Sequence, residues 1–510
     1  MRDRLRAALS RLRGWPLALM VALVVAVAFR LYALGRLPGI NGDEAWYGVQ
    51  VRRFLSGAHV DWRTPTGNLP GPLHAGILLV LQSVAGASLA LLRAPSVLAS
   101  LAQMVLSYFV VRRHFDRSTG ALALVLTAVL PINIAYARFG WDPSHSGLVA
   151  IVATHFALAG NPWACAVSFA VALAVHPTNV FLAPFLVLAF LGMEWGRGEW
   201  MRALWRTGLC GALLASALAL LSRTTSGGRA SVVWAEVVAR VGRPSEWGTF
   251  LTLYARFLSG DTVYSYIVGS GLGEARGSAD LAVATVLLGL LGVGVWRLSR
   301  APSWGPVGVV AGWGASLVLF FALAGNGAIQ PHFERYAVCL VVPTVLGVSV
   351  LLRELGGRGA HVWRPYALTA VVSVLLLSGF WLRYFRSLEE TGSTSHETFW
   401  TGAEEPKAEA FRRMLAEAGP RGGARVMAEN WWVYWALAYL GGGSPLDVHD
   451  ATDGLGSVPP GGTYWVAFPG GPLDRWLAAN RMASVHWEIP GAGRPVALRV
   501  WWSPPPTAAR

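Results

Sequence analysis

Two adjacent carboxylates, Asp43 and Glu44, lie in the sequence NGDEAWYG just after the first long apolar segment. A third acid, Asp142, follows a later apolar segment in YARFGWDPS, four residues after Arg138. A carboxylate that reaches a hydroxyl group can remove its proton as a general base. An arginine can stabilise negative charge on a phosphate through paired hydrogen bonds. These residue types suit a reaction that moves a proton and releases an anionic leaving group.

Each of these residues also has a structural interpretation. A pair of acids beside a membrane boundary can simply be solvated. Asp142 can begin a short helix, because Pro143 follows it at a favoured first helical position. His176, in VHPTNV, could contact a phosphate or an acceptor, or it could be a satisfied histidine at the membrane interface. The sequence alone leaves these alternatives open.

The composition indicates an α-helical polytopic membrane protein. Of the 510 residues, 54% are hydrophobic and 14% are charged, and the mean hydropathy is +0.46. Many uninterrupted apolar stretches are typical of a chain that crosses a membrane. The net charge is +14, but the arginines cluster at the ends of apolar segments, which indicates membrane topology rather than a nucleic-acid partner.

We expect about eleven spans, because each crossing needs about 20 mainly apolar residues. The candidates are roughly 15–34, 95–111, 119–137, 145–160, 163–176, 177–193, 203–222, 280–296, 304–324, 336–352 and 366–384. Segment 74–92 is also apolar, but counting it as a crossing would place all four arginine clusters that follow it outside. The bias of basic residues toward the cytoplasm therefore favours a cytoplasmic amino terminus, with 74–92 along the outer face.

This assignment of spans places the candidate residues on the outer face of the membrane. The outer regions are loop 35–94, the turn 138–144, loop 223–279, the turn 325–335 and the tail after residue 385. The tail carries β-like runs, YWVAF and ALRVWW, between the helix-like stretches 406–417, 431–440 and 473–480. We therefore expect a transmembrane catalytic domain over 1–384 and a small external soluble α/β domain over 385–510.

Common signatures of soluble enzymes are missing from the sequence. It contains no GxSxG, P-loop or HExxH motif, and GLGEARG at 271–277 follows no predicted strand, so it is not a dinucleotide fingerprint. No cytoplasmic segment is long enough to fold a nucleotide-sugar domain. If the enzyme uses an activated sugar, the donor must therefore arrive through the membrane.

The order of four segments resembles a known family. The segments are GDEAWYGVQVRRFLSG, LLRAPSVLASLAQMVLSYFVVRRHF, PINIAYARFGWDPS and ERYAVCLVVPTVLG. Together they resemble bacterial GT-C glycosyltransferases of the protein O-mannosyltransferase and aminoarabinose transferase kind. The resemblance covers roughly residues 15–190 and 325–350, and it extends to the topology and the external carboxy-terminal domain.

The resemblance implies an inverting enzyme of the inner membrane that takes a sugar from a polyprenyl-phosphate donor on the outer leaflet. Asp43 matches the first-loop acid expected as base or acceptor-positioning group, Glu44 lies beside it, and Asp142 matches the second acid. The residues expected near the donor phosphate and its lid are Arg93, Arg138, Arg335 and Tyr336. The chain departs from the family at NLPGPLHAG (with Asn68 and His74) and at HPTN, where many relatives carry lysine, so His176 is added to the donor-binding set.

Several questions stay open at the level of the sequence. The acceptor can be a protein, a glycan or a lipid, and the aromatic stretch NWWVYW could either stack on a sugar or form part of a core. The reaction requires no metal cofactor; Asp43, Glu44 and Asp142 could hold a divalent ion, but no ligand spacing indicates one. The alternative from another class is a polytopic lipid or sugar transporter or flippase. Such proteins usually carry ionisable residues deep in their spans, and this chain has few.

Overall fold

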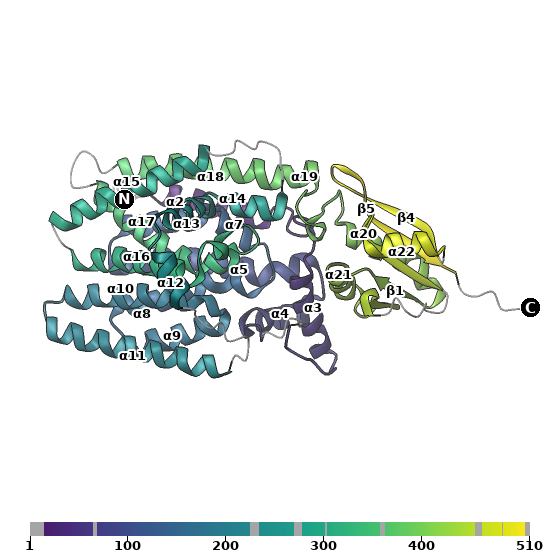
Figure 1. The fold of residues 1–510 in the computed structure, drawn as a ribbon, viewed down its shortest axis with the longest axis horizontal. Coiled ribbons are helices and arrows are strands. Elements are labelled where there is room, and N and C mark those ends of the chain that lie inside the picture. Colours follow the sequence, from purple (N-terminus) through teal and green to yellow (C-terminus); the bar gives the residue numbers. More distant parts are fainter. Residues whose placement is uncertain are drawn as a thin grey trace, which may run out of the picture.

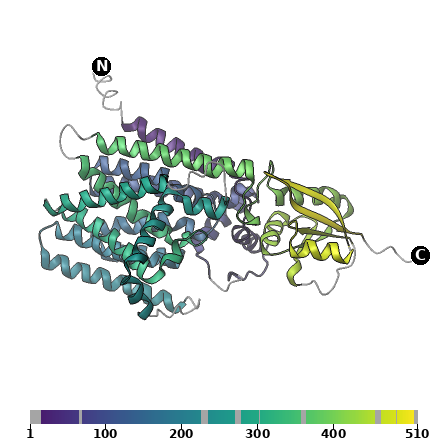
Figure 2. The ribbon, with the colours of Figure 1, turned by 45° about the horizontal axis from the view of Figure 1, so that its top comes forward.

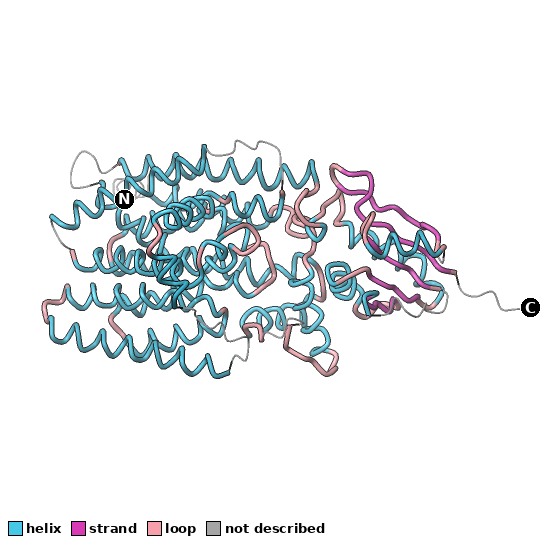
Figure 3. Tube along the Cα trace, viewed as in Figure 1, coloured by secondary structure: helices cyan, strands magenta, loops and turns pink. Residues whose placement is uncertain are grey.

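The computed structural model describes residues 15–64, 69–224, 234–269, 278–300, 303–356, 363–453, 462–481 and 483–504. The first fourteen residues with their arginines, Asn68 and the glycine-rich segment 271–277 lie outside these ranges. Figure 1 shows a long body of helices that ends in a small α/β unit. The described strands all lie at that one end, as the colouring in Figure 3 makes clear.

Within the described ranges, six helical segments are long and apolar enough to cross a membrane. They are Leu89–His114, Pro177–Trp195, Trp200–Leu220, Trp304–Ala324, Glu334–Leu355 and Arg364–Thr391. The chain is therefore a multi-pass membrane protein, and its long helices run along the body (Figure 2). Shorter apolar helices accompany them, so the expected eleven spans stay a prediction.

The body contains the helices α2 to α19, in chain order. Their bounds are α2 Trp15–Leu31, α3 Gly42–Leu55, α4 Pro72–Ala85, α5 Leu89–His114, α6 Arg117–Val129, α7 Pro131–Tyr136, α8 Ser146–Ala159, α9 Pro162–Val175, α10 Ala183–Trp195, α11 Trp200–Thr224, α12 Trp234–Val241, α13 Pro244–Ser259, α14 Asp261–Val263, α15 Ser278–Arg300, α16 Trp304–Ala324, α17 Val341–Gly356, α18 Arg364–Phe380 and α19 Ser387–Thr391.

The apolar segment 74–92 is split between two helices. Helix α4 ends at Ala85, and the 26-residue α5 begins at Leu89 after Ser88 caps it through Leu91 N–H. At 1.5 Å per residue the 14 residues of α4 span about 21 Å, short of the roughly 30 Å hydrocarbon core of a bilayer. Helix α4 lies beside α3 at the end of the body that carries the α/β unit (Figure 1).

Short helical turns interrupt the long helices at this same end. Proline residues at positions 131, 143 and 177 stand at the first or second residue of α7, of η1 (Asp142–His145) and of η2 (Pro177–Leu182). Proline has no N–H to donate and clashes with the preceding turn, so a helix restarts there. A further turn, η5 (Glu334–Leu340), leads into α17. These breaks place Asp142, His176 and Arg335 at helix ends rather than inside spans.

The carboxy-terminal sheet has five strands in the order β2-β1-β3-β5-β4. The strands are β1 Ala424–Ala428, β2 Leu446–Asp450, β3 Thr463–Ala467, β4 Ser484–Gly491 and β5 Arg494–Ser503. Strand β1 pairs in parallel with β2 and β3, and β5 pairs antiparallel with β3 and β4. The runs YWVAF and ALRVWW fall on β3 and β5, so the expected small α/β unit is confirmed.

Helices cover both faces of this sheet. Helices α20 (Pro406–Ala418) and α21 (Trp431–Gly441) bury Met414 and Leu437 against Val426 and Val500. Helix α22 (Pro472–Asn480) packs on the other face against Trp465. In the three central strands β1, β3 and β5, alternating residues face the two layers, so both faces of the sheet are apolar there. The expected helical stretches at 406–417, 431–440 and 473–480 match these helices closely.

Candidate active site

Helix α3 begins in a way that presents Asp43 and Glu44 in different directions. Asn41 caps the helix: its Oδ1 accepts a hydrogen bond from Asp43 N–H at 2.8 Å, and Glu44 Oε1 accepts one from Asn41 N–H at 3.0 Å. This reciprocal capping box satisfies donors that the first turn of a helix otherwise leaves open. Since successive helical residues do not face each other, Glu44 points inward while Asp43 stays at the surface.

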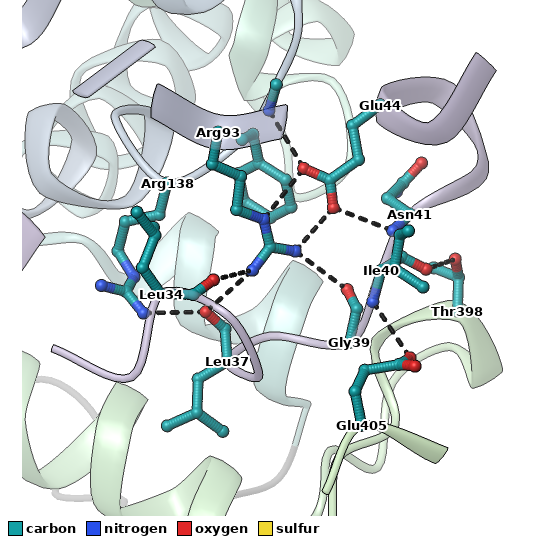
Figure 4. Close-up of polar contacts among 12 residues, drawn as sticks. Leu34, Leu37, Gly39, Ile40, Asn41, Glu44, Arg93, Arg138, Thr398 and Glu405 are labelled. Atoms are coloured by element: carbon teal, nitrogen blue, oxygen red, sulfur yellow. Dashed lines mark hydrogen bonds and ion pairs between the residues drawn. The ribbon is translucent and has the colours of Figure 1, made fainter. Parts of the chain in front are cut away.

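Glu44 is fully enclosed in a network of hydrogen bonds (Figure 4). Arg93 donates to it from Nε at 3.0 Å and from Nη2 at 2.6 Å, and Gly140 N–H donates at 3.0 Å. The side chains of Glu44 and Arg93 are both 0% exposed. A buried pair of this kind depends on having its remaining hydrogen-bonding capacity satisfied, and here it is.

Arg93 and Arg138 use their guanidinium groups to hold the segment before α3. Arg93 Nη1 donates to the carbonyl oxygens of Leu34 and Leu37, and its Nη2 donates to Gly39 O as well as to Glu44. Arg138 Nη2 also donates to Leu37 O, at 2.8 Å. The two side chains are 0% exposed, so their donors point into the protein and away from the surface at which Asp43 lies.

Asp43 lies at the surface beside an arginine. Its side chain is 34% exposed, and its Oδ2 is 4.0 Å from Nη1 of Arg335. Burial by the surrounding chain raises the pKa of Asp43; the charge of Arg335 lowers it, and that of Glu44 adds to the rise. A carboxylate with a raised pKa that is still reachable from outside can take a proton from a hydroxyl group.

Three residues expected near the donor phosphate lie together next to Asp43. The Arg335 guanidinium lies over the rings of Trp141, at 5.7 Å, and Tyr336, at 5.3 Å. The His176 ring stacks on Tyr336, with centroids 6.1 Å apart. His176 Nδ1 is 2.7 Å from the hydroxyl of Thr178. The aromatic faces fix the direction of the guanidinium, which is 22% exposed as a side chain.

Asp142 is placed differently from Asp43. Its Oδ2 accepts a hydrogen bond from Gly71 N–H at 2.6 Å, and the Tyr47 hydroxyl donates to the same carboxylate. Burial raises its pKa to about 7, against the effect of these two hydrogen bonds. The acid therefore joins α3, through Tyr47, to the residue that precedes α4. A second contact joins α4 to η1, because His74 Nδ1 and His145 Nε2 are 3.0 Å apart.

A second network ties the segment before α3 to the carboxy-terminal region. Glu405 Oε1 accepts from Ile40 N–H at 3.2 Å and from Lys407 Nζ at 2.8 Å. Thr398 Oγ1 donates to Ile40 O, and Lys407 donates to Thr398 O. Gly39 N–H donates to Phe399 O. Residues 39–41 are thus held from both sides, by Arg93 and by Glu405.

Further aromatic residues lie near Asp43. They are Tyr266, His332, His396, Trp431 and Trp432, which come from four separate parts of the chain. The two tryptophans belong to NWWVYW, for which the sequence left both stacking on a sugar and a place in a core open. No local motif marks the other three. The sequence does single out Lys407, because it is the only lysine of the chain. In the structure its side chain is 1% exposed.

No group of three or more histidine, cysteine, aspartate or glutamate side chains is arranged to hold a metal ion in the part of the chain that the structure describes. A cavity of about 620 Å³ lies at the other end of the body, lined in part by His114, Arg197, Trp304 and Arg353. It contains none of the expected site residues. Helix α17 runs between the two places, from η5 beside Asp43 to Arg353.

The fold is similar to that of ArnT from Cupriavidus metallidurans. The crystal structure with bound undecaprenyl phosphate has 17% identity and a TM-score of 0.53, and the match covers 96% of this chain and 98% of that chain. Its apo state has 16% identity and a TM-score of 0.51 over 96% and 98%. The Archaeoglobus fulgidus oligosaccharyltransferase with zinc and sulfate has 14% identity and a TM-score of 0.46 over 82% and 61%.

No protein-family model matches the chain, and no curated protein matches it in sequence. At 16–17% identity, the similarity to ArnT concerns the fold, and it extends over nearly the whole of both chains. The fold expected from the four sequence segments is therefore confirmed.

Proposed function

We propose that this chain is a GT-C glycosyltransferase that moves a sugar from a polyprenyl-phosphate donor to an acceptor on the outer face of the membrane. The observation that carries the proposal is the placement of a reachable carboxylate, Asp43, 4.0 Å from a reachable guanidinium, Arg335. Glycosyl transfer from a phosphate needs a base for the acceptor and a cation for the leaving group. The ArnT fold, seen elsewhere with undecaprenyl phosphate, supports the choice of donor.

In the proposed reaction, Asp43 accepts the proton of the acceptor hydroxyl group. The oxygen attacks the anomeric carbon from the side opposite the phosphate, so the configuration inverts. The bond between the anomeric carbon and the phosphate oxygen breaks, and polyprenyl phosphate leaves with the electron pair. Arg335 stabilises the charge on that phosphate. Phosphate is already a good leaving group, so the scheme uses neither a general acid nor a metal ion.

The other expected residues support these two. Tyr336 and His176 lie around Arg335 and orient the donor phosphate. Glu44, Arg93 and Arg138 act as positioning residues, because their polar atoms hold the segment before α3. Asp142 positions α3 and α4 relative to each other through Tyr47 and Gly71. In this scheme fewer residues contact the substrate than the resemblance of the sequence segments implies.

We also propose the topology that this reaction needs. Residues 1–384 form the transmembrane catalytic domain in the inner membrane, with the amino terminus in the cytoplasm, and residues 385–510 form the external domain. The three native cysteines are buried and should not react with an impermeant maleimide. Single cysteines introduced at the surface can therefore be labelled selectively. Cysteine at the exposed Ser56 is expected to react with an impermeant maleimide from outside, and cysteine at Ser299 only from the cytoplasm. The reverse pattern would overturn the orientation.

Transfer of labelled sugar in purified membranes tests the reaction directly. Membranes with wild-type protein or Asp43→Asn are supplied with a panel of polyprenyl-phosphate sugars and endogenous acceptors. Label is expected to move to an acceptor with wild-type protein and to stay on the lipid with the variant. A folded wild-type protein that transfers nothing from any donor would contradict the proposal. Full activity of Asp43→Asn would show that Asp43 is not the general base.

A further inference from the structure

Aromatic side chains lie near Asp43 and Arg335. We define the aromatic rim as the following five residues: Tyr266, His332, His396, Trp431 and Trp432. Tyr266 follows α14, His332 precedes η5, and the other three come from the region after α19 and from the start of α21. All five are at least partly exposed. The rim therefore combines the body of helices with the carboxy-terminal unit.

Pairwise contacts connect the rim on its body side. The rings of Tyr266 and His332 are 4.8 Å apart and perpendicular. Burial raises the pKa of Tyr266, and the charges of Arg335, which lowers it, and of Asp43, which raises it, both act on this hydroxyl. His332 in turn is close enough to Arg335 and His396 for both to lower its pKa. This side of the rim thus lies next to both proposed catalytic groups.

Ring contacts also connect the rim residues on its carboxy-terminal side. His396 and Trp432 have ring centroids 5.1 Å apart, and Trp432 and Trp431 are 6.1 Å apart. A Cβ atom added at Gly42 would come within 2.5 Å of the Trp431 ring, so this indole lies directly against the residue before Asp43. The rim thus has two groups of contacting rings, and the carboxy-terminal group lies against the residue before Asp43.

The rim offers ring faces and neutral polar atoms. Burial is the main cause that lowers the pKa of both His332 and His396, so each imidazole is neutral at neutral pH and can donate and accept one hydrogen bond. The Trp431 Nε1–H is buried against Gly42 and is not among the polar groups that the rim offers. Ring faces with a few directed polar groups suit a ligand that has both C–H-rich faces and hydroxyl groups.

One rim residue is held in an unusual backbone conformation. His332 has φ of +82°, a left-handed value that is rare for residues with a side chain. Its ring is fixed between Tyr266, at 4.8 Å, and Phe333, at 4.9 Å. Such conformations persist where the surroundings fix them, and they gather at ligand-binding sites. The position of this imidazole in the rim is therefore fixed by its neighbours.

We propose that the acceptor is an uncharged glycan, whose sugar ring lies against the aromatic rim and whose attacking hydroxyl group reaches Asp43. This inference rests on the proposed function and names its acceptor class. A phosphorylated lipid acceptor would need a cation of its own, whereas the exposed cation next to the rim, Arg335, serves the donor phosphate in the proposed reaction. An acceptor peptide would use backbone donors and acceptors, for which the rim offers mainly ring faces.

The test uses the full-length protein in detergent with a donor from the polyprenyl-phosphate panel. Three acceptors are compared: neutral oligosaccharides, a phosphorylated glycolipid and a serine- and threonine-rich peptide. Hydrolysis of the donor by water is measured in parallel, because it reports the reaction without the acceptor. We expect transfer to a neutral oligosaccharide. Transfer only to the phosphorylated lipid or only to the peptide would overturn the inference and leave the proposed function standing.

Variants then test the rim itself. Trp432→Leu and His332→Gly remove rings, and glycine tolerates the positive φ at position 332; Trp431 is kept because it packs on Gly42. Each variant is expected to lower the ratio of glycan transfer to donor hydrolysis about tenfold, the effect of losing a contact of about 1.4 kcal/mol. Trp432→Phe should restore part of the ratio.

Trp205→Leu is the matched control, since Trp205 is 72% exposed on α11, far from the rim. Unchanged ratios in Trp432→Leu and His332→Gly would overturn the acceptor site. If the wild-type protein neither hydrolyses any donor nor transfers its sugar, the proposed function fails, and the inference fails with it.

Discussion

Asp43 and Glu44 are neighbours in the sequence, but their carboxylates lie in opposite environments. Glu44 is 0% exposed, and its oxygens accept hydrogen bonds from Arg93 and from two backbone N–H groups. Asp43 is 34% exposed and 4.0 Å from a guanidinium that is also partly exposed. A carboxylate whose lone pairs are all used stabilises structure, whereas one that is left partly open can exchange a proton. The comparison separates the proposed catalytic acid, Asp43, from a structural one, Glu44.

The largest effect is expected from Asp43→Asn. The amide keeps the size of the side chain but cannot accept the acceptor's proton, so the transfer rate should fall by roughly 10²–10⁴-fold, the usual contribution of a general base. The midpoint of thermal unfolding should stay close to that of the wild type. Sugar transfer and a thermal melt of the same preparation measure both quantities. A large loss of thermal stability without loss of transfer would reverse the roles of the two acids.

Glu44→Ala should show the opposite pattern. It leaves the Arg93 guanidinium buried without its partner, which costs about 3–5 kcal/mol of the free energy of unfolding. The melting temperature should fall strongly, and the transfer rate should fall with the fraction of folded protein. The double variant Glu44→Ala/Arg93→Met is the control. It should recover only part of the stability, because Arg93 also donates to Leu34 and Leu37.

This contrast also shows what the sequence can reveal. Strands β3 and β5 were predicted because their apolar and aromatic runs are local signals. The order of the segments around Asp43, Asp142 and Arg335 likewise predicted that these residues share one end of the body. The inward direction of Arg93 could not be predicted, because its partners are backbone carbonyls more than fifty residues earlier in the chain. Of the aromatic rim, the sequence indicated only Trp431 and Trp432, as part of NWWVYW. Tyr266, His332 and His396 were missed because no local pattern connects them to Asp43.

Asp142→Asn should change how stability depends on pH. Burial raises the pKa of Asp142 to about 7, above the value near 4 of an unfolded chain. Between these values the folded state keeps a proton that the unfolded state releases. The contribution of this group to the free energy of unfolding therefore falls as the pH rises from about 4 to 7, and it does not change further above about 7. Asparagine does not titrate and should remove this slope. Thermal melts of both proteins at pH 5 and pH 8 measure it; equal slopes would contradict the assignment.

A second pair of adjacent acids repeats the contrast outside the proposed site. Glu405 is 2% exposed and pairs with Lys407, 1% exposed, at 2.8 Å. Glu404 is 42% exposed and pairs with Arg412, 61% exposed, at 3.0 Å. The two ion pairs have similar lengths but differ in solvent access. Distance alone would therefore assign them similar importance, whereas burial would not.

The smallest effect is expected from Glu404→Gln. An exposed ion pair gains little in water and is screened by salt, so the free energy of unfolding should change by less than about 1 kcal/mol. Glu405→Gln, its matched comparison, leaves the only lysine of the chain buried beside a neutral amide and weakens the hold on Ile40 N–H. It should therefore cost about 3–5 kcal/mol. Unfolding of both variants at low and high salt measures the difference. Equal losses would mean that burial does not decide the role of a carboxylate here, and the assignment of Glu44 as structural would lose its basis.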